Sequence, residues 1–174
     1  MRCSYTLIIA FLLLSAIGPA NASAQRTDNE IMSLCGVPGV FVILEALQPD
    51  VVAAGLSAER IHTSVEAQLR DAGIAVLTEQ EFYKQPGRPH LYIFVNTVLE
   101  PQTGLYALNI LVQFRQAVRL IRDGDIASDS ASTWETGTTG MVGTPRIATY
   151  PLDAIGEFID EFIGDYYSVN PRRG

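Results

Sequence analysis

Cysteine is scarce in this chain of 174 residues, which contains two, Cys3 and Cys35. Cys3 falls within an N-terminal segment that we expect to be removed, so that Cys35 then stands alone and an internal disulfide is excluded. A lone thiol in an oxidising compartment is usually buried. We therefore expect Cys35 to lie buried beneath the turn at residues 36–39, with a disulfide between two molecules as the alternative.

Basic residues and histidines are also few. The chain has 12 Lys and Arg against 19 Asp and Glu, a net charge of −7, which argues against nucleic acid and anionic membranes as partners. The two histidines, His62 and His90, fall in different predicted elements, and we find no second ligand at metal-binding spacing beside either. We expect both to be surface or edge residues, and we expect no metal and no other cofactor.

The sequence has neither a nucleophile elbow nor a phosphate-binding loop of the Walker type. Gly137, Gly140 and Gly143 precede a predicted helix, but Thr144-Pro145 follows where such a loop has Lys and Ser or Thr. We favour a flexible hairpin or a bulged strand end for these glycines, and a candidate ligand loop over residues 137–143 is the alternative. We predict that the chain is not an enzyme. A hydrolase would need a pocket that unites a histidine with a serine and a carboxylate.

The N-terminus has the pattern of a secretory signal peptide over residues 1–24. Arg2 supplies a positive charge, residues 7–17 form an apolar run too short to span a membrane, and Ala22-Ser23-Ala24 fits signal peptidase. We predict cleavage after Ala24, with residues 20–22 as the alternative site. The residues before Cys35 do not form a lipobox, so that the product is expected to be periplasmic or secreted, to have no membrane anchor and not to be a lipoprotein.

The rest of the chain has the composition of one folded domain, from residue 39 to residue 171, after a flexible tail at 25–38. Hydrophobic periodicity, capping residues and turn residues locate its elements. We predict strands at 40–47, 74–77, 91–99, 105–121 and 131–136, a polar loop at 122–130, and helices at 58–72 and from Pro151 to Asn170, with a single helical turn after Thr78.

The order β-α-β-β-β-β-α predicts an α/β fold close to the α+β class, a two-layer sandwich. Its sheet is expected to be mixed but mostly antiparallel, with about five strands, and to have both helices packed on one face. No repeat and no second domain is indicated.

Several short segments resemble a family of uncharacterised secreted bacterial α/β proteins. They are Gly55-Leu56-Ser57, Ala72-Gly73-Ile74, Thr133-Trp134-Glu135, Gly140-Met141-Val142-Gly143 and Phe162-Ile163-Gly164-Asp165-Tyr166, within a match from Phe41 to Pro171. The element order is more distantly similar to small periplasmic domains, namely the amino-terminal domain of the TolB translocation protein and the curli-secretion type. The resemblance implies a fold, an exported location and docking onto other envelope proteins, and it transfers no catalytic residue.

A sheet with both helices on one face leaves its other face to water or to a partner. Aromatic residues interleaved with arginine are typical of interaction surfaces. The residues that we place on this face are Tyr92, Phe94, Leu111, Gln113, Arg115, Arg119 and Trp134. The alternative is an exposed sheet with ordinary cross-strand pairs.

The leading hypothesis from the sequence is an exported, non-enzymatic module of the bacterial cell envelope that binds another protein. The partner is expected to be an envelope protein or a second copy of the chain, and the contact is expected at the free sheet face or at an edge strand. A small-ligand carrier that uses residues 137–143 is the alternative, and an uncharacterised hydrolase is the third.

Overall fold

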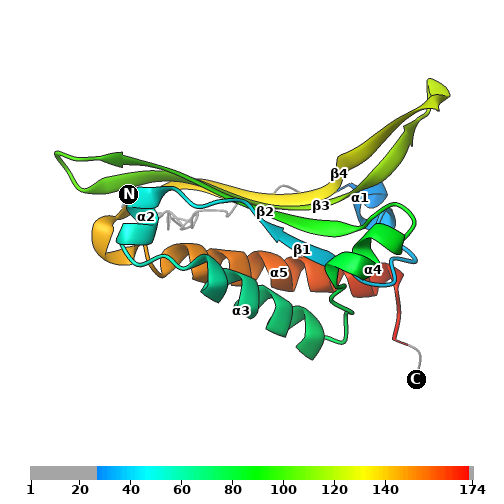
Figure 1. Cartoon of the computed structure of the whole chain (residues 1–174), viewed down its shortest axis with the longest axis horizontal. Helices are drawn as coiled ribbons and strands as arrows, with labels where there is room; N and C mark the ends of the chain where they lie inside the picture. Colours follow the sequence, from blue (N-terminus) through cyan, green and yellow to red (C-terminus); the bar gives the residue numbers. More distant parts are fainter. Residues whose placement is uncertain (1–26, 173–174) are drawn as a thin grey trace, which may run out of the picture.

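The computed structural model describes residues 27–172, which form an α/β fold with a four-stranded mixed sheet (Figure 1). The predicted signal peptide and its cleavage after Ala24 lie outside these residues. The strands are β1 (Phe41–Leu44), β2 (His90–Glu100), β3 (Leu105–Leu120) and β4 (Asp123–Gly143). The α-helices are α1 (Asp28–Met32), α2 (Pro49–Ala53), α3 (Ala58–Asp71), α4 (Glu79–Lys84) and α5 (Tyr150–Val169), and a single 3-10 turn, Thr144–Arg146, precedes α5.

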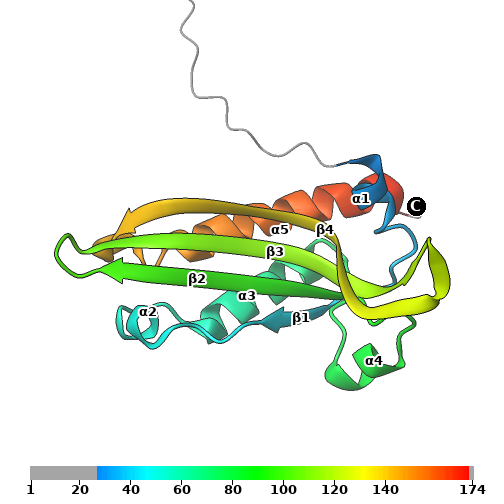
Figure 2. The ribbon, with the colours of Figure 1, turned by 90° about the horizontal axis from the view of Figure 1, so that it is seen from above.

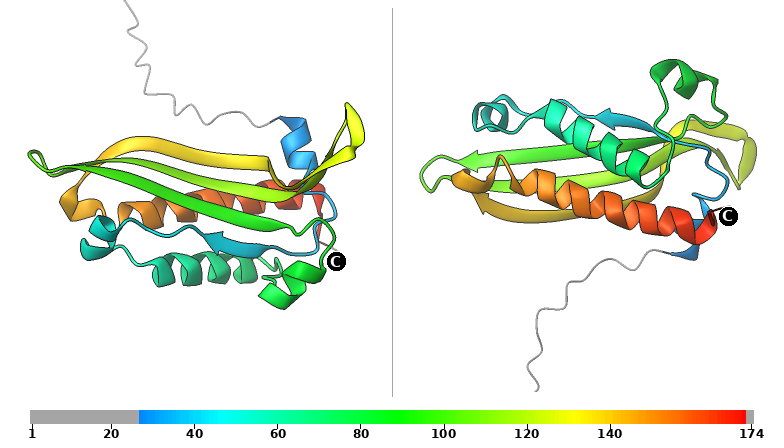
Figure 3. Two further views of the ribbon diagram at one scale, coloured as in Figure 1. Left: turned by 45° about the horizontal axis from the view of Figure 1, so that its top comes forward. Right: turned by 90° about the horizontal axis from the view of Figure 1, so that it is seen from below.

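The sheet has the order β1-β2-β3-β4, with β1 parallel to β2 and the other pairs antiparallel. The two long helices, α3 and α5, contact each other and lie on one face of the sheet (Figures 1 and 3). Seen from above, the long strands β2, β3 and β4 are crossed by no helix of residues 27–172 (Figure 2). The two-layer arrangement therefore leaves one sheet face open.

The predicted count of five strands is wrong in two places. Residues 74–77 contribute only an isolated parallel bridge between Val76 and Val40. The predicted loop at 122–130 and the predicted strand at 131–136 belong together to β4, which runs on to Gly143. Residues 123–130 are mostly polar, and side chains on both sides of this segment are exposed. The segment pairs with β3 through backbone hydrogen bonds, which leave no hydrophobic alternation in the sequence from which a strand could be predicted.

The hairpin between β3 and β4 bends away from the helices at its far end (Figure 1). The pairing register of the two strands shifts between Phe114 and Arg115 and again between Gln116 and Val118. Extra residues of this kind are β-bulges, which bend a strand and increase its local twist. The bent hairpin closes one end of the open face.

The predicted flexible tail is wrong for residues 27–38, which are folded onto the domain. Thr27 and Glu30 form a capping box that starts α1, and Leu34 is fully buried in the core. The side-chain amide of Asn170 donates to the carbonyl of Leu34 at 2.9 Å and accepts from the amide of Gly36 at 2.8 Å. Because Leu34 occupies the buried position, the neighbouring Cys35 is exposed, which corrects its predicted burial.

The predicted helix at 58–72 is confirmed, and capping residues mark both of its ends. Ser57 accepts a hydrogen bond from the backbone amide of Arg60 and begins α3, and Gly73 follows its end with φ of 86°. The buried stripe of α3 packs with α5 beneath the sheet. The buried side chains are Ile61, Val65 and Leu69 of α3 and Ala154, Ile155, Phe158, Ile159 and Phe162 of α5.

Gly137 is needed where β4 passes Leu111. A Cβ atom built on Gly137 would lie 2.4 Å from the carbonyl oxygen of Ile110 and 2.6 Å from a methyl carbon of Leu111, whereas one on Gly140 meets nothing within 4 Å. Gly137→Ala is expected to lower the free energy of unfolding by about 1–3 kcal/mol. Gly140→Ala, the matched control in the same strand, is expected to stay within about 0.5 kcal/mol of wild type. Urea unfolding measures both, and equal effects would contradict this packing.

Candidate functional site

The open face of the sheet is made of every second side chain along its strands. In β2, Leu91, Ile93 and Val95 are buried against the helices, and the residues between them therefore point the other way. Cross-strand pairing extends this face over the whole sheet. The open face comprises Ile43, Tyr92, Phe94, Asn96, Val98, Ala107, Asn109, Leu111, Gln113, Arg115, Glu135, Gly137, Thr139 and Met141.

Five of the predicted surface residues lie together on the open face, and two do not. Tyr92, Phe94, Leu111, Gln113 and Arg115 come from the facing stretches of β2 and β3. The prediction is wrong for the other two. Trp134 is fully buried and pairs with the core residue Phe114 of β3. Arg119 lies in the bent hairpin, where it donates to the carbonyl of Gly124 at 2.7 Å. A shift of one residue in the pairing moves a side chain to the opposite face of a sheet. β4 has one extra residue next to Trp134, and this β-bulge produces that shift.

One end of the open face carries an aromatic and charged cluster. The Tyr92 hydroxyl donates to the carboxylate of Glu45, which follows β1, and the Arg115 guanidinium carbon lies 4.9 Å from the centre of the Tyr92 ring. The hydrogen bond to Glu45 raises the pKa of the Tyr92 phenol, because ionisation would remove the donor beside the carboxylate. Arg115 Nε is buried with no acceptor among the described residues. Tyrosine and arginine held in place in this way are typical hot-spot residues.

The neighbouring polar contact joins β3 to β4. Gln113 donates through its amide to the carboxylate of Glu135 at 2.8 Å, and the Ser132 hydroxyl lies 3.3 Å from the same carboxylate. These two contacts hold the Glu135 carboxylate in place near the outer edge of the sheet.

The rest of the open face has two apolar rows, with a polar row of Asn96, Asn109 and Thr139 between them. Phe94 and Leu111 are half-buried neighbours in its middle, and further along Val98 and Met141 are 65% and 69% exposed. A hollow of about 270 Å³ lies beside Leu111 above Gly137, where β4 has no side chain. Single exposed apolar residues are ordinary, whereas several exposed apolar residues on one sheet face are consistent with an interaction surface.

His90 meets a serine, although not in a catalytic arrangement. Its Nδ1–H donates to the carbonyl of Arg88 at 2.9 Å, and its Nε2 lies 3.5 Å from the Ser130 hydroxyl. A backbone carbonyl therefore stands where a catalytic triad has a carboxylate. His90 is 6% exposed beneath the bent hairpin, so the predicted surface or edge position is wrong and a substrate has no access to the imidazole. His62 is partly exposed on α3, with its Nδ1 3.6 Å from the Glu66 carboxylate.

Burial makes His90 a source of pH-dependent stability. Desolvation lowers the pKa of His90, and the positive charge of Arg115 acts in the same direction. The unfolded chain then takes up a proton below pH about 6.5 that the folded chain resists. We expect the free energy of unfolding to be level above that pH and to fall below it. The fall is less than about 1.4 kcal/mol per pH unit, the slope for one whole proton taken up on unfolding. His90→Asn should reduce this loss between pH 7 and pH 5 in thermal unfolding, and His62→Asn should not; an unchanged profile would contradict the burial.

The glycines of the candidate ligand loop do not form a loop. Gly137, Gly140 and Gly143 all lie within β4 and pair with β3. Their backbone amides are therefore set along a strand and do not converge on the start of α5. The geometry that a ligand cradle requires is absent from residues 137–143.

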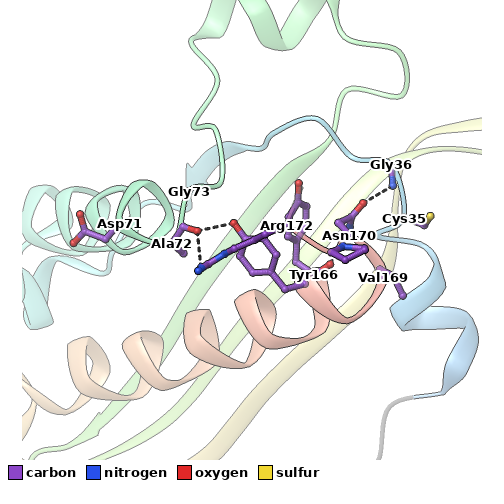
Figure 4. Close-up of a pocket in the computed structure, with 11 residues that line it drawn as sticks. Cys35, Gly36, Asp71, Ala72, Gly73, Tyr166, Val169, Asn170 and Arg172 are labelled. Carbon is purple, nitrogen blue, oxygen red and sulfur yellow. Dashed lines mark hydrogen bonds between the residues drawn. The ribbon is translucent and has the colours of Figure 1, made fainter. Parts of the chain in front are cut away.

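A separate pocket lies between the ends of α3 and α5 and the segment after α1 (Figure 4). It has a volume of about 880 Å³, and the exposed Cys35 lies at its rim. Tyr167 and Arg172 both donate to the carbonyl of Ala72, at 2.5 and 3.1 Å, and the Tyr166 hydroxyl donates to the carbonyl of Val37 at 2.9 Å. These groups fasten α5 to α3 and to the segment after α1, which is a structural role.

Two kinds of site are absent from the described part of the chain. Residues 27–172 contain no group of three or more His, Cys, Asp or Glu side chains that could hold a metal ion. None of their helices combines the length and the apolar character needed to cross a membrane.

Comparisons of the chain with protein families, with curated proteins and with solved structures gave no match.

Proposed function

We propose that this chain is an exported, non-enzymatic module of a bacterial cell envelope, which binds another protein through the open face of its sheet. The observation that carries the proposal is the apolar content of that face. An antiparallel sheet packed on one side usually presents polar residues on the other. Here Phe94, Leu111, Val98 and Met141 face away from the helices instead, and no described element covers them.

The aromatic and charged cluster supports the same proposal. Glu45, Tyr92 and Arg115 hold one another in place at one end of the apolar surface. A partner that covers the face would meet a rigid tyrosine and arginine with part of their side-chain entropy already lost. Such preorganised groups contribute most of the binding free energy in many interfaces.

Export is supported by the signal-peptide pattern of residues 1–24. Expression of the full chain in a bacterium, followed by N-terminal sequencing of the product outside the cytoplasm, should give Gln25 as the first residue. A product that begins at Met1 and stays in the cytoplasm would overturn this part of the proposal.

Hydrogen exchange locates the binding surface. The protein is used to capture its partner from envelope extract, and amide exchange of the complex is compared with that of the free protein. Protection is expected at β2 and β3, over residues 92–98 and 107–115, because a partner there excludes water from both strands. Protection restricted to α3 and α5 would place the partner on the helical layer and overturn the open face as the site.

A further inference from the structure

β1 is an edge strand, and within residues 27–172 its outer side has no partner strand along its length (Figure 2). The residue before β1, Val40, is paired on this side, because its amide donates to the carbonyl of Ala75 and its carbonyl accepts from the amide of Leu77. The chain then turns into α4, which Thr78 caps. Beside β1 itself, the position of a further strand in line with residues 75–77 is therefore open.

The backbone groups of Val42 and Leu44 point toward this open side. Such groups alternate in direction along a strand, and the amides of Phe41 and Glu45 donate toward β2, at 3.1 and 3.0 Å. Val42 and Leu44 therefore face away from β2, and no hydrogen bond within residues 27–172 reaches their amides or carbonyls. Val42 is only 2% exposed, so that its backbone groups are also largely removed from water. Because buried backbone groups are nearly always paired, this edge suits an added strand.

A groove of about 460 Å³ lies between this edge and the first turns of α3. It is lined by residues 41–44 of β1 and by Ala58, Glu59 and His62 of α3. The side chains of Val42 and Leu44 point toward the helices, since both residues pair with buried residues of β2. Side chains of an added strand that lie opposite these two residues share their face, and therefore enter the groove. Apolar side chains fit there, because most of the lining is apolar.

Glu59 gives the groove a negative charge. Its side chain is exposed and forms no ion pair within residues 27–172, whereas His62 lies 3.6 Å from the Glu66 carboxylate. A lysine or arginine beside the apolar residues of an added strand would meet the Glu59 carboxylate. The net charge of −7 also favours the approach of a basic segment.

We propose that the outer side of β1 binds an extended segment of a partner protein, in which two apolar residues two positions apart are flanked by lysine or arginine. The segment pairs with the backbone of Val42 and Leu44, its apolar side chains enter the groove over Ala58, and a basic side chain meets Glu59. A second copy of the chain does not fit, because β1 has no Lys or Arg beside it, and two paired β1 strands would bring Glu45 and Glu59 of both copies to one interface. This site is separate from the open face, and the inference goes beyond the proposed function.

A labelled peptide tests this inference directly. The probe is the heptapeptide Lys-Thr-Val-Thr-Val-Thr-Lys with both ends blocked, and the comparison peptide has the same residues in the order Lys-Thr-Thr-Val-Val-Thr-Lys. Fluorescence anisotropy with the purified protein should show binding of the alternating peptide that is about tenfold or more tighter than that of the comparison peptide. N-methylation of one alternate set of its amides should remove the binding and methylation of the other set should not, because only one edge of an added strand pairs with β1.

Substitutions in α3 identify the groove. Ala58→Phe fills it, and should weaken binding of the alternating peptide about tenfold or more. Ala67→Phe, the matched control, changes another exposed alanine of α3 that lies outside the groove, and should leave binding within about twofold.

Charge reversal tests the contact with the basic residue. Glu59→Lys should weaken binding of the alternating peptide about threefold or more at low ionic strength. Glu79→Lys makes the same change in the first turn of α4, and should have no such effect.

Amide exchange followed by NMR locates the added strand. In the free protein the amide of Ile43, which faces β2, should exchange more slowly than those of Val42 and Leu44, which have no acceptor within residues 27–172. The alternating peptide should slow the exchange of the Val42 and Leu44 amides. Unchanged exchange of both amides with the peptide bound would place the peptide elsewhere and overturn the inference.

The other contradicting outcomes are equal binding of the two peptides, and equal losses in Ala58→Phe and Ala67→Phe. They leave the proposed function in place if the captured partner protects the open face. If the alternating peptide binds as expected while no partner protects β2 and β3, the edge of β1 is a binding site and the open face is not.

Discussion

Replacement of Trp134 by alanine is expected to lower the free energy of unfolding by about 3–5 kcal/mol, the usual cost of removing a large buried aromatic side chain. Trp134 is fully buried, and its ring meets Phe162 of α5 edge-to-face at 5.2 Å between centroids. Its indole N–H donates to the Asp165 carboxylate at 2.8 Å. The substitution therefore removes packing between the two layers and a charge-assisted hydrogen bond at once.

Trp134→Phe separates these two contributions. Phenylalanine keeps a ring against Phe162 but withdraws the donor to Asp165, which is expected to cost about 1–3 kcal/mol. Urea unfolding of the three proteins gives the series. If Trp134→Ala unfolds at the wild-type urea concentration, Trp134 does not belong to the core, and the assignment of the two faces of β4 is wrong.

Elements with local signals could be predicted from the sequence. Ser57 before an amphipathic stripe and Gly73 after it define α3, and Thr78 with Glu81 forms the capping box that starts α4. These signals need only neighbouring residues. The polar segment from Thr27 has the same kind of capping box, and its short helix was missed because no apolar stripe follows it.

Two features depend on residues that are far apart in the sequence: the extent of the hairpin, and the sheet face on which each side chain of β4 lies. An extra residue of β4 beside Trp134 reverses the alternation that would otherwise place this side chain on the open face. Nothing in the sequence near Trp134 marks the bulge, since it is defined by pairing with Phe114 and Arg115 of β3. The same holds for residues 123–130, where backbone pairing leaves no apolar pattern.

The open face could be predicted in part. Alternation in β2 and β3 is sufficient to bring Tyr92, Phe94 and Leu111 together. The contact between Tyr92 and Glu45 could not be predicted, because it requires β1 and β2 to pair in parallel across three intervening helices. Met141 was missed because no regular strand was predicted beyond residue 136.

Loss of partner binding is the second large effect that we expect. Val98→Glu with Met141→Glu places two charges on the apolar part of the open face, and burial of an unpaired carboxylate under a partner is strongly unfavourable. The affinity for the captured partner should fall about 100-fold or more. Both side chains are largely exposed, so that the melting temperature should stay within a few degrees of wild type.

The matched control places the same two charges elsewhere on the surface. Met32 of α1 is 56% exposed and Val52 of α2 is 51% exposed, and neither belongs to the open face. Met32→Glu with Val52→Glu should bind the partner as wild type does.

A titration of the captured partner against these three proteins tests the open face most directly. The predicted result is a large loss of affinity for the Val98→Glu and Met141→Glu protein alone, with all three proteins folded. Equal affinity of all three for the partner would contradict the open face as the binding surface.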